Sequence, residues 1–176
     1  QEIVKTYYEQ DKDENDVAVG TDIQRITNSN YSIHDRAKNS TIENYEINEL
    51  SAEVFIDVQV IDNEIYDRYG NAERQTIKTY DNLGKLPEFL VSEKLVLNSY
   101  GDASATIQVR LANGTIETRS ATLARKKGSA LTTTSTETDK AGKLISESIS
   151  TTSLFDIRAN AIKQSTQKSV ADSLGA

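Results

Sequence analysis

The stretch DKDENDVAVGTD, residues 11–22, places oxygen-bearing side chains at the spacing of a calcium-binding loop. Such a loop takes side-chain oxygens from its first, third and fifth positions, a main-chain carbonyl from its seventh and a carboxylate from its twelfth. Calcium is therefore the one cofactor that the sequence indicates. The five residues at the ligand positions are Asp11, Asp13, Asn15, Val17 and Asp22.

Two departures from the calcium pattern favour a simpler alternative. The sixth position is Asp16, where the tight turn of such a loop favours glycine, and the twelfth is an aspartate, which is shorter than the usual glutamate. The alternative is an exposed acidic loop in which Asn15 and Asp16 form the turn. If calcium binds, we expect a weak surface site of the extracellular kind.

A second acidic cluster follows a predicted strand and consists of Asp62, Glu64 and Asp67. Carboxylates at this spacing could ligate a cation together with the first loop. Runs of this kind are more often the solvated surface of a turn.

Catalytic patterns are missing from the sequence. The single histidine, His34, lies in a polar stretch, and no G-x-S-x-G sequence supplies an activated serine for it. The phosphate-binding patterns G-x-G-x-x-G and G-x-x-x-x-G-K-[ST] are also missing. With no cysteine, a disulfide, a thiolate metal site and a cysteine nucleophile are excluded. We therefore expect a protein that is not an enzyme.

The charge of the chain is unevenly distributed along its length. The net charge is −7; residues 1–67 hold 16 acidic and 5 basic residues, whereas residues 68–176 hold 11 acidic and 15 basic ones. An acidic half argues against nucleic acid as a partner, because phosphate binding requires a basic surface. The asymmetry is either a chance segregation of surface charge or a means of steering one copy onto another.

Alternating apolar residues predict an antiparallel sheet over residues 51–128. In EVFIDVQVI, residues 53–61, the apolar side chains that we expect on one face are Val54, Ile56, Val58 and Val60. The Asn-Gly pair at 113–114 is typical of a hairpin turn. Residues 1–50 are acidic and show no sustained period, so we expect them to be rich in loops.

Two further elements complete the predicted fold. Residues 129–152 read as a Thr/Ser-rich hairpin with too little apolar surface to fold alone, so it must either lie over the sheet or project and pair with something else. Residues 153–174 show a helical period, with Ser153 as N-cap. The apolar stripe of this predicted helix comprises Phe155, Ala159, Ile162, Thr166, Val170 and Leu174.

We therefore expect an α+β, β-dominant fold within a single domain, 1–176. It would be an antiparallel meander sheet or sandwich, with a polar hairpin and one C-terminal amphipathic helix. The hydrophobic share of 36% is below the usual ~45–50%, which predicts a thin core.

The sequence favours a non-catalytic structural or interaction protein of the cell surface or envelope. It would assemble into an oligomer or filament through strand edges and opposed charge, with protein partners and no nucleic acid. Two alternatives remain open: a monomeric periplasmic accessory or ligand-binding module, and a structural subunit of a virion or tail. The candidate interface residues are Arg125, Lys126 and Lys127 of a basic run and Thr132, Thr134 and Thr136 of the hairpin.

No apolar run approaches the ~18–20 residues that a membrane-spanning helix needs, so we expect no membrane-spanning segment. The sequence begins with Gln1, which suggests either a cleaved leader or a trimmed chain. The expected location is extracellular, at the cell surface or periplasmic after leader removal.

Calcium and self-assembly can be tested together by light scattering in excess calcium and then in chelator. A calcium site within residues 11–22 that supports assembly predicts large particles that dissolve on chelation. Assembly that is indifferent to calcium contradicts the site but not the assembly. A particle of about 20 kDa in both conditions, close to the 19.5 kDa of one chain, supports the monomeric module.

Overall fold

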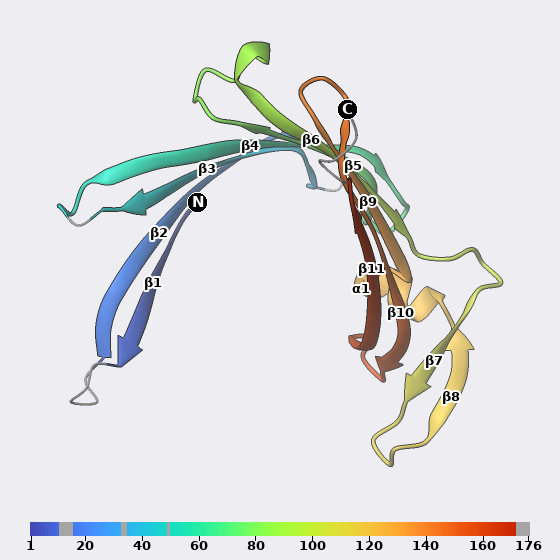
Figure 1. The fold of residues 1–176 in the computed structure, drawn as a ribbon. Helices are drawn as coiled ribbons and strands as arrows, with labels where there is room; N and C mark the ends of the chain where they lie inside the picture. The colour runs from blue at the N-terminus through green and yellow to red at the C-terminus, as the bar shows by residue number, and fades with distance from the viewer. Residues whose placement is uncertain (11–15, 33–34, 49, 172–176) are drawn as a thin grey trace. The chain divides into compact units, whose positions relative to one another are not determined.

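The structure is a computed structural model of the 176-residue chain, and it describes residues 1–10, 16–32, 35–48 and 50–171 (Figure 1). Strands dominate these residues, which confirms the predicted β-dominant fold class. The helical elements among them are short: the 3-10 helix η1 (Pro87–Phe89) and the helix α1 (Thr122–Lys127).

The strands form one large, mostly antiparallel sheet with hydrogen-bonded order β1-β2-β3-β4-β5-β6-β9-β10-β7-β8, and β11 pairs with β10. The contact between β10 and β7 is parallel and short. The bounds are β1 (Glu2–Gln10), β2 (Asp16–Tyr31), β3 (Ala37–Ile47), β4 (Glu53–Tyr66), β5 (Ala72–Tyr80), β6 (Leu90–Ser99), β7 (Thr106–Arg110), β8 (Ile116–Ser120), β9 (Thr132–Asp139), β10 (Leu144–Asp156) and β11 (Ala161–Val170).

The chain divides into two compact units. Unit 1 comprises Gln1–Asp62 and Ile77–Ser92, and unit 2 comprises Asn63–Thr76 and Glu93–Ala176. Strands β4, β5 and β6 each contribute residues to both units, because the unit boundaries fall within these strands.

Unit 1 has a small apolar centre supported by aromatic and charged neighbours. Its buried apolar side chains are Ile23 of β2 and Val58 of β4. The Tyr45 and Phe55 rings meet edge to face, with centroids 5.8 Å apart, and the Arg25 guanidinium lies 4.7 Å from the Tyr45 centroid. Aromatic and cation–π contacts of this kind add to the stabilisation that so little buried area provides.

Residues 1–50, which the sequence suggested were rich in loops, contain β1, β2 and β3. These strands lack apolar alternation because polar side chains bond across them instead. The Gln24 amide donates to Asn44 at 3.0 Å, and the Asn44 amide donates to Asp57 at 2.5 Å. Such polar rungs stabilise strand pairing but leave no hydrophobic period in the sequence.

The prediction that Val54, Ile56, Val58 and Val60 share one face of β4 is wrong. The β3–β4 register shifts between Asn44 and Tyr45, so that β4 contains one extra residue at this point. Tyr45 is opposite Phe55 and Glu43 is opposite Val58, which places Phe55 on the face of the buried Val58. Ile56 is 47% exposed as a result.

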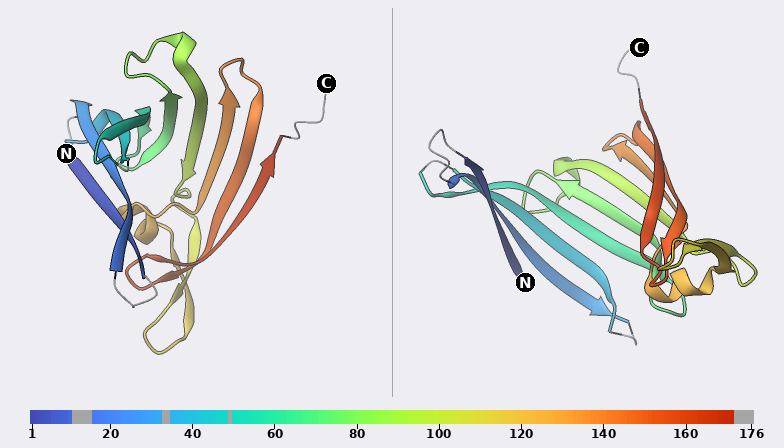
Figure 2. Two further views of the ribbon diagram at one scale, coloured as in Figure 1. Left: turned by 60° about the vertical axis from the view of Figure 1, so that its left-hand side comes forward. Right: turned by 90° about the horizontal axis from the view of Figure 1, so that it is seen from below.

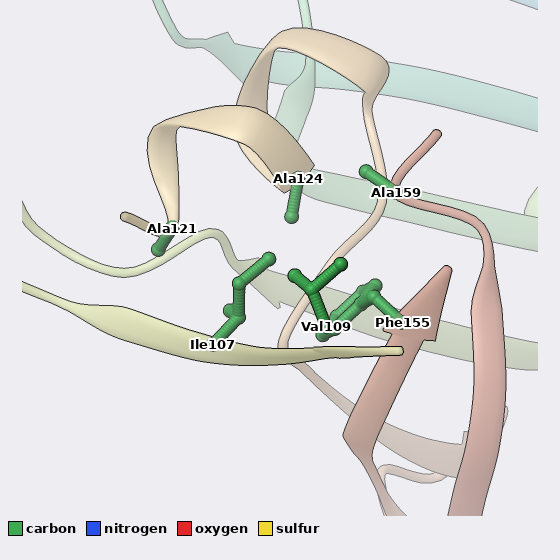
Figure 3. Packing of buried hydrophobic residues seen from close by; sticks show 6 residues of the cluster. All are labelled: Ile107, Val109, Ala121, Ala124, Phe155 and Ala159. Carbon is green, nitrogen blue, oxygen red and sulfur yellow. The ribbon is translucent and has the colours of Figure 1, made fainter. Parts of the chain in front are cut away.

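The core of unit 2 lies where α1 packs over β7 and the end of β10 (Figure 3). Val109 is fully buried and Phe155 is 1% exposed. Small side chains at the contact allow the elements to approach closely. The cluster comprises Ile107, Val109, Ala121, Ala124, Phe155 and Ala159, with Ala105, Leu111, Leu123 and Leu131 packed against it.

The predicted C-terminal helix over 153–174 is wrong for the described residues to Val170. Strand β10 continues to Asp156, and β11 pairs antiparallel with it. The turn between them is fixed by the Asp156 carboxylate, which accepts hydrogen bonds from the main-chain N–H groups of Arg158 and Asn160, each at 2.8 Å. This local turn, together with a polar and Ser/Thr-rich strand that pairs along β10, overrides the helical spacing of the apolar residues.

The polar hairpin neither lies over the sheet nor projects from it. Strand β9 lies between β6 and β10 in the sheet order, and β10 lies between β9 and β11. The three strands run side by side in both views of Figure 2. Few apolar groups are needed here because both main-chain edges of each inner strand are hydrogen-bonded.

The exposed fractions of Phe155 and Ile162 distinguish the observed strands from the predicted helix. The helix would bury both side chains on one stripe. In the structure Phe155 is 1% exposed and Ile162 is 43% exposed. We expect Phe155→Ala to lower the free energy of unfolding by about 3–5 kcal/mol. The control Ile162→Ala should change it by less than about 1 kcal/mol. Urea unfolding followed by circular dichroism measures both, and equal losses would contradict this core.

Candidate interaction edge

Three strands have a hydrogen-bonded partner on one side only among the described residues: β1, β8 and β11. Strand β8 is five residues long, and its Arg119 and Glu117 pair with each other at 3.1 Å. Strands β1 and β11 are longer, at 9 and 10 residues. A long strand with one open side is a template for pairing with another chain.

The phase of β11 against β10 shows which of its main-chain groups are free. The N–H of Ala171 donates to the carbonyl of Ile145 at 2.9 Å, and the pairing is regular from Ser146–Val170 to Thr152–Gln164. Because hydrogen-bonded residues alternate in an antiparallel pair, the odd-numbered residues of β11 bond to β10. The residues whose N–H and C=O groups point away from β10 are Gln164, Thr166, Lys168 and Val170.

Every residue of β11 is exposed. The strand has no proline and no acidic residue, and its two charged side chains are Lys163 and Lys168. Edge lysines discourage pairing with identical edges because like charges repel. The two lysines therefore make the β11 edge more favourable for a strand that brings negative charge than for a second β11.

A row of hydroxyl and amide groups holds β11 in register with the interior strands. Thr133 donates to Asn98 at 2.8 Å, Ser135 and Ser148 are 2.8 Å apart, and Ser150 and Thr166 are 2.8 Å apart. The row links β6, β9, β10 and β11. Side-chain bonds of this kind help to fix the register of the strands without an apolar core.

A shallow depression of about 410 Å³ lies beside the start of β11 within unit 2. Of its apolar lining residues, Leu154 is buried and Ile116 is 52% exposed. Arg110 and Lys163 border it, and both are exposed. The lining residues are Gln108, Arg110, Ile116, Ser153, Leu154 and Lys163. Two cations beside apolar side chains suit an acidic chain segment with apolar neighbours.

The calcium-loop residues Asp11, Asp13 and Asn15 lie outside the described residues. Val17 and Asp22 both lie within β2, where Asp22 is opposite Lys5 on β1 and Glu46 on β3. The Tyr7 hydroxyl donates to the Asp22 carboxylate at 2.8 Å, and this hydrogen bond raises the pKa of Tyr7. Among the described residues no three carboxylate or imidazole groups are grouped as metal ligands. Calcium binding therefore stays a prediction.

The second acidic cluster is divided among separate partners. Asp62 accepts from Asn39 at 3.3 Å, and Glu64 accepts from Thr76 at 2.5 Å and pairs with Arg74 at 2.7 Å. Asp67, the third residue of the cluster, pairs with Arg125 at 2.8 Å, so each of the three carboxylates contacts a different side chain.

Arg125, predicted as part of a basic docking run, is engaged inside unit 2. It pairs with Asp67 at 2.8 Å and with Glu73 at 3.0 Å, and it donates to the carbonyl of Gly101 at 3.3 Å. Asn71, in the turn between β4 and β5 next to Asp67, donates from its side-chain amide to the Arg125 carbonyl at 2.6 Å. Arg125 therefore ties α1 to the β4–β5 turn.

Lys126 and Lys127, the other two residues of the run, are exposed at the end of α1. Thr132, Thr134 and Thr136 share one face of β9, half-buried, opposite Thr151, Ile149 and Glu147 of β10. Since β9 is an interior strand, only their side chains are accessible to a partner. The structure does not bring the lysines and these threonines into one described site, and their interface role stays a prediction.

Sequence reasoning missed β11 as an edge because its residues also fit a helical stripe. One signal was available: Asp156 and Asn160 flank a short polar segment typical of a tight turn. The segment AIKQSTQKSV that follows has Ser, Thr and Val at positions where a stable surface helix favours Ala, Leu or Glu.

Comparison of the chain with protein-family models, curated proteins and solved structures gave no match. Over the part of the chain that the structure describes, no helix has both the length and the apolar character to cross a membrane.

The Asp67–Arg125 contact predicts a dependence of stability on pH. The Asp67 side chain is 3% exposed. Burial raises its pKa, but the hydrogen bonds from Asn71, Arg125 and Tyr69 outweigh burial, so the pKa lies below its usual value. An unfolded aspartate titrates near pH 3.9, so this contribution is complete above that value and is lost as the pH falls through the lower folded pKa.

We therefore expect Asp67→Asn to lower the free energy of unfolding at pH 7 and to reduce the loss of stability between about pH 5 and pH 2. Glu73→Gln is the matched control, because the Glu73 side chain is 36% exposed and its pairing with Arg125 should matter less. Urea unfolding at several pH values measures both variants. An Asp67→Asn protein with unchanged pH dependence would contradict this role of the contact.

Proposed function

We propose that this protein is a non-catalytic structural protein that assembles with copies of itself by strand addition at the β11 edge. One observation carries the proposal: β11 is a ten-residue strand, exposed along its whole length, with one hydrogen-bonded partner among the described strands. Strand addition satisfies the outward main-chain groups of such an edge, and it requires no catalytic residues.

The distribution of charge between the units supports self-association. Unit 1 carries 16 acidic and 7 basic residues, a net charge of −9, and unit 2 carries 11 acidic and 13 basic residues, a net charge of +2. Attraction between unit 1 of one copy and unit 2 of another steers encounters in one direction. Head-to-tail contacts of this kind extend into filaments unless the rotation between copies closes a ring.

The same proposal includes a location at the cell surface or in the envelope. Its support is a polar composition and a sheet edge that is open to pairing with another strand. A monomeric accessory module remains the opposite outcome of the experiment below.

A proline at Gln164 tests strand addition directly. The Gln164 N–H points away from β10, so Gln164→Pro removes a donor from the open edge while keeping the bonds to β10. We expect assembly to weaken by about tenfold or more, because an incoming strand would lose a hydrogen bond and meet the proline ring. Light scattering over a concentration series measures the change.

The matched control is Gln164→Thr, which changes the side chain but keeps the N–H, and it should assemble as the unsubstituted protein does. Circular dichroism and urea unfolding verify that both variants retain the fold. Unchanged assembly of a folded Gln164→Pro protein contradicts addition at β11. A monomeric unsubstituted protein contradicts self-assembly altogether.

A further inference from the structure

We infer that the strand that adds to β11 is β1 of a second copy, antiparallel to it, with Glu2 opposite Lys168. This inference rests on the proposed function, because it names the partner of the same edge. Its evidence is independent of that proposal: the main-chain phase of β1, the regularity of the two edges and the positions of their charges.

The phase of β1 is fixed by its pairing with β2. The N–H of Ile26 donates to the carbonyl of Gln1 at 2.7 Å, and the register is regular from Glu2–Arg25 to Tyr7–Gly20. Alternation along an antiparallel pair then directs the N–H and C=O groups of the even-numbered residues away from β2. The outward residues of this stretch are Glu2, Val4 and Thr6.

Outward residues on the two edges must face each other for hydrogen bonds to form. The outward residues are even-numbered on both β1 and β11, so the allowed antiparallel registers differ by steps of two residues. One-residue slips are excluded because they would oppose an outward group to an inward one.

Charge selects among the allowed registers. With Glu2 opposite Lys168, Val4 faces Thr166 and Thr6 faces Gln164. A two-residue slip in one direction puts Lys5 opposite Lys163, and like charges directly opposite each other are unfavourable.

A two-residue slip in the other direction leaves Lys168 without an acidic partner. It places Glu9 opposite Lys163. Glu9 lies beyond the shift in the β1–β2 register between Tyr7 and Tyr8. The alternation that aligns main-chain groups is interrupted there, so this register pairs fewer of them.

Glu2 is available for the pair. It contacts Arg25 at 3.0 Å, yet its side chain is 53% exposed. Arg25 also pairs with Glu53 at 2.8 Å, so it keeps a carboxylate partner when Glu2 turns toward a second copy. A carboxylate has lone pairs enough to accept from both an arginine and a lysine.

Disulfide cross-linking reports the register, because the chain contains no cysteine of its own. In the inferred register Lys5 and Ser165 face each other as a non-hydrogen-bonded pair, about 4.5 Å apart between Cα atoms. That separation is within the range that a disulfide bridges, whereas a two-residue slip gives about 7–8 Å. Both side chains are exposed, so cysteine at either position disturbs little packing.

The experiment mixes full-length single-cysteine proteins under mild oxidation and measures the disulfide-linked heterodimer on non-reducing gels. Lys5→Cys is kept constant and combined with Ser165→Cys, or with Gln167→Cys or Lys163→Cys as two-residue slips. We expect the Ser165→Cys mixture to cross-link at least about fivefold more than either control, given the difference in separation.

A control mixture that cross-links as well as the Ser165→Cys mixture overturns the register. Particles that light scattering still detects, with no cross-link in any mixture, overturn β1 as the partner and leave strand addition at β11 intact. Monomers throughout overturn both proposals. A Lys5→Cys/Ser165→Cys double variant that links within one chain at high dilution overturns the second copy as the partner.

Charge reversal gives a second readout that does not depend on cysteine. Lys168→Glu would place a carboxylate opposite Glu2, and we expect assembly to weaken by about threefold or more. Lys163→Glu is the matched control on the same strand and should weaken assembly less, because Tyr7 is opposite Lys163 in this register. A larger effect at Lys163 would contradict the inferred pairing.

Discussion

The main-chain hydrogen-bond ladder is the interaction on which the rest of this structure depends. Among the described residues, the fully buried apolar side chains are few and small, and the largest are Phe155, Val58 and Val109. Buried area of this size contributes little hydrophobic stabilisation for a chain of 176 residues. The strands must therefore be held mainly by bonds to their neighbours, and each interior strand is paired on both sides.

Polar side chains replace the missing apolar contacts in a regular way. The Gln24–Asn44–Asp57 rung in unit 1 and the hydroxyl row from Asn98 to Thr166 in unit 2 both bond side chains across strands. At α1 charge adds to apolar packing, because Arg125 joins the helix to the carboxylates of Asp67 and Glu73 beside the buried Ala121 and Ala124. A sheet of this kind tolerates exposed strands, since its cohesion does not depend on covering them.

An open edge is the structural consequence with the most bearing on function. A sheet that is stabilised by main-chain hydrogen bonds ends at the strand beyond which the chain supplies no further strand. That last strand has a row of main-chain N–H and C=O groups without a partner strand. Lysines on β11 and glutamate on β1 make the two long edges chemically different. In the proposed assembly this difference between the edges would give the contact between copies its direction.

The β-dominant class, the turn at Asn113–Gly114 and the segregation of charge could be predicted from the sequence, because they depend on residues close together along the chain. The sequence did not determine the face of β4, the strands within residues 1–50, or the strand β11. The extra residue in β4 leaves Ile56 exposed where the sequence predicted it buried. The strands within residues 1–50 pair through cross-strand amides, which produce no apolar period. The Asp156 turn forms a hairpin in a segment whose apolar residues have helical spacing. Each outcome depends on a neighbouring strand, so only the tertiary structure could decide it.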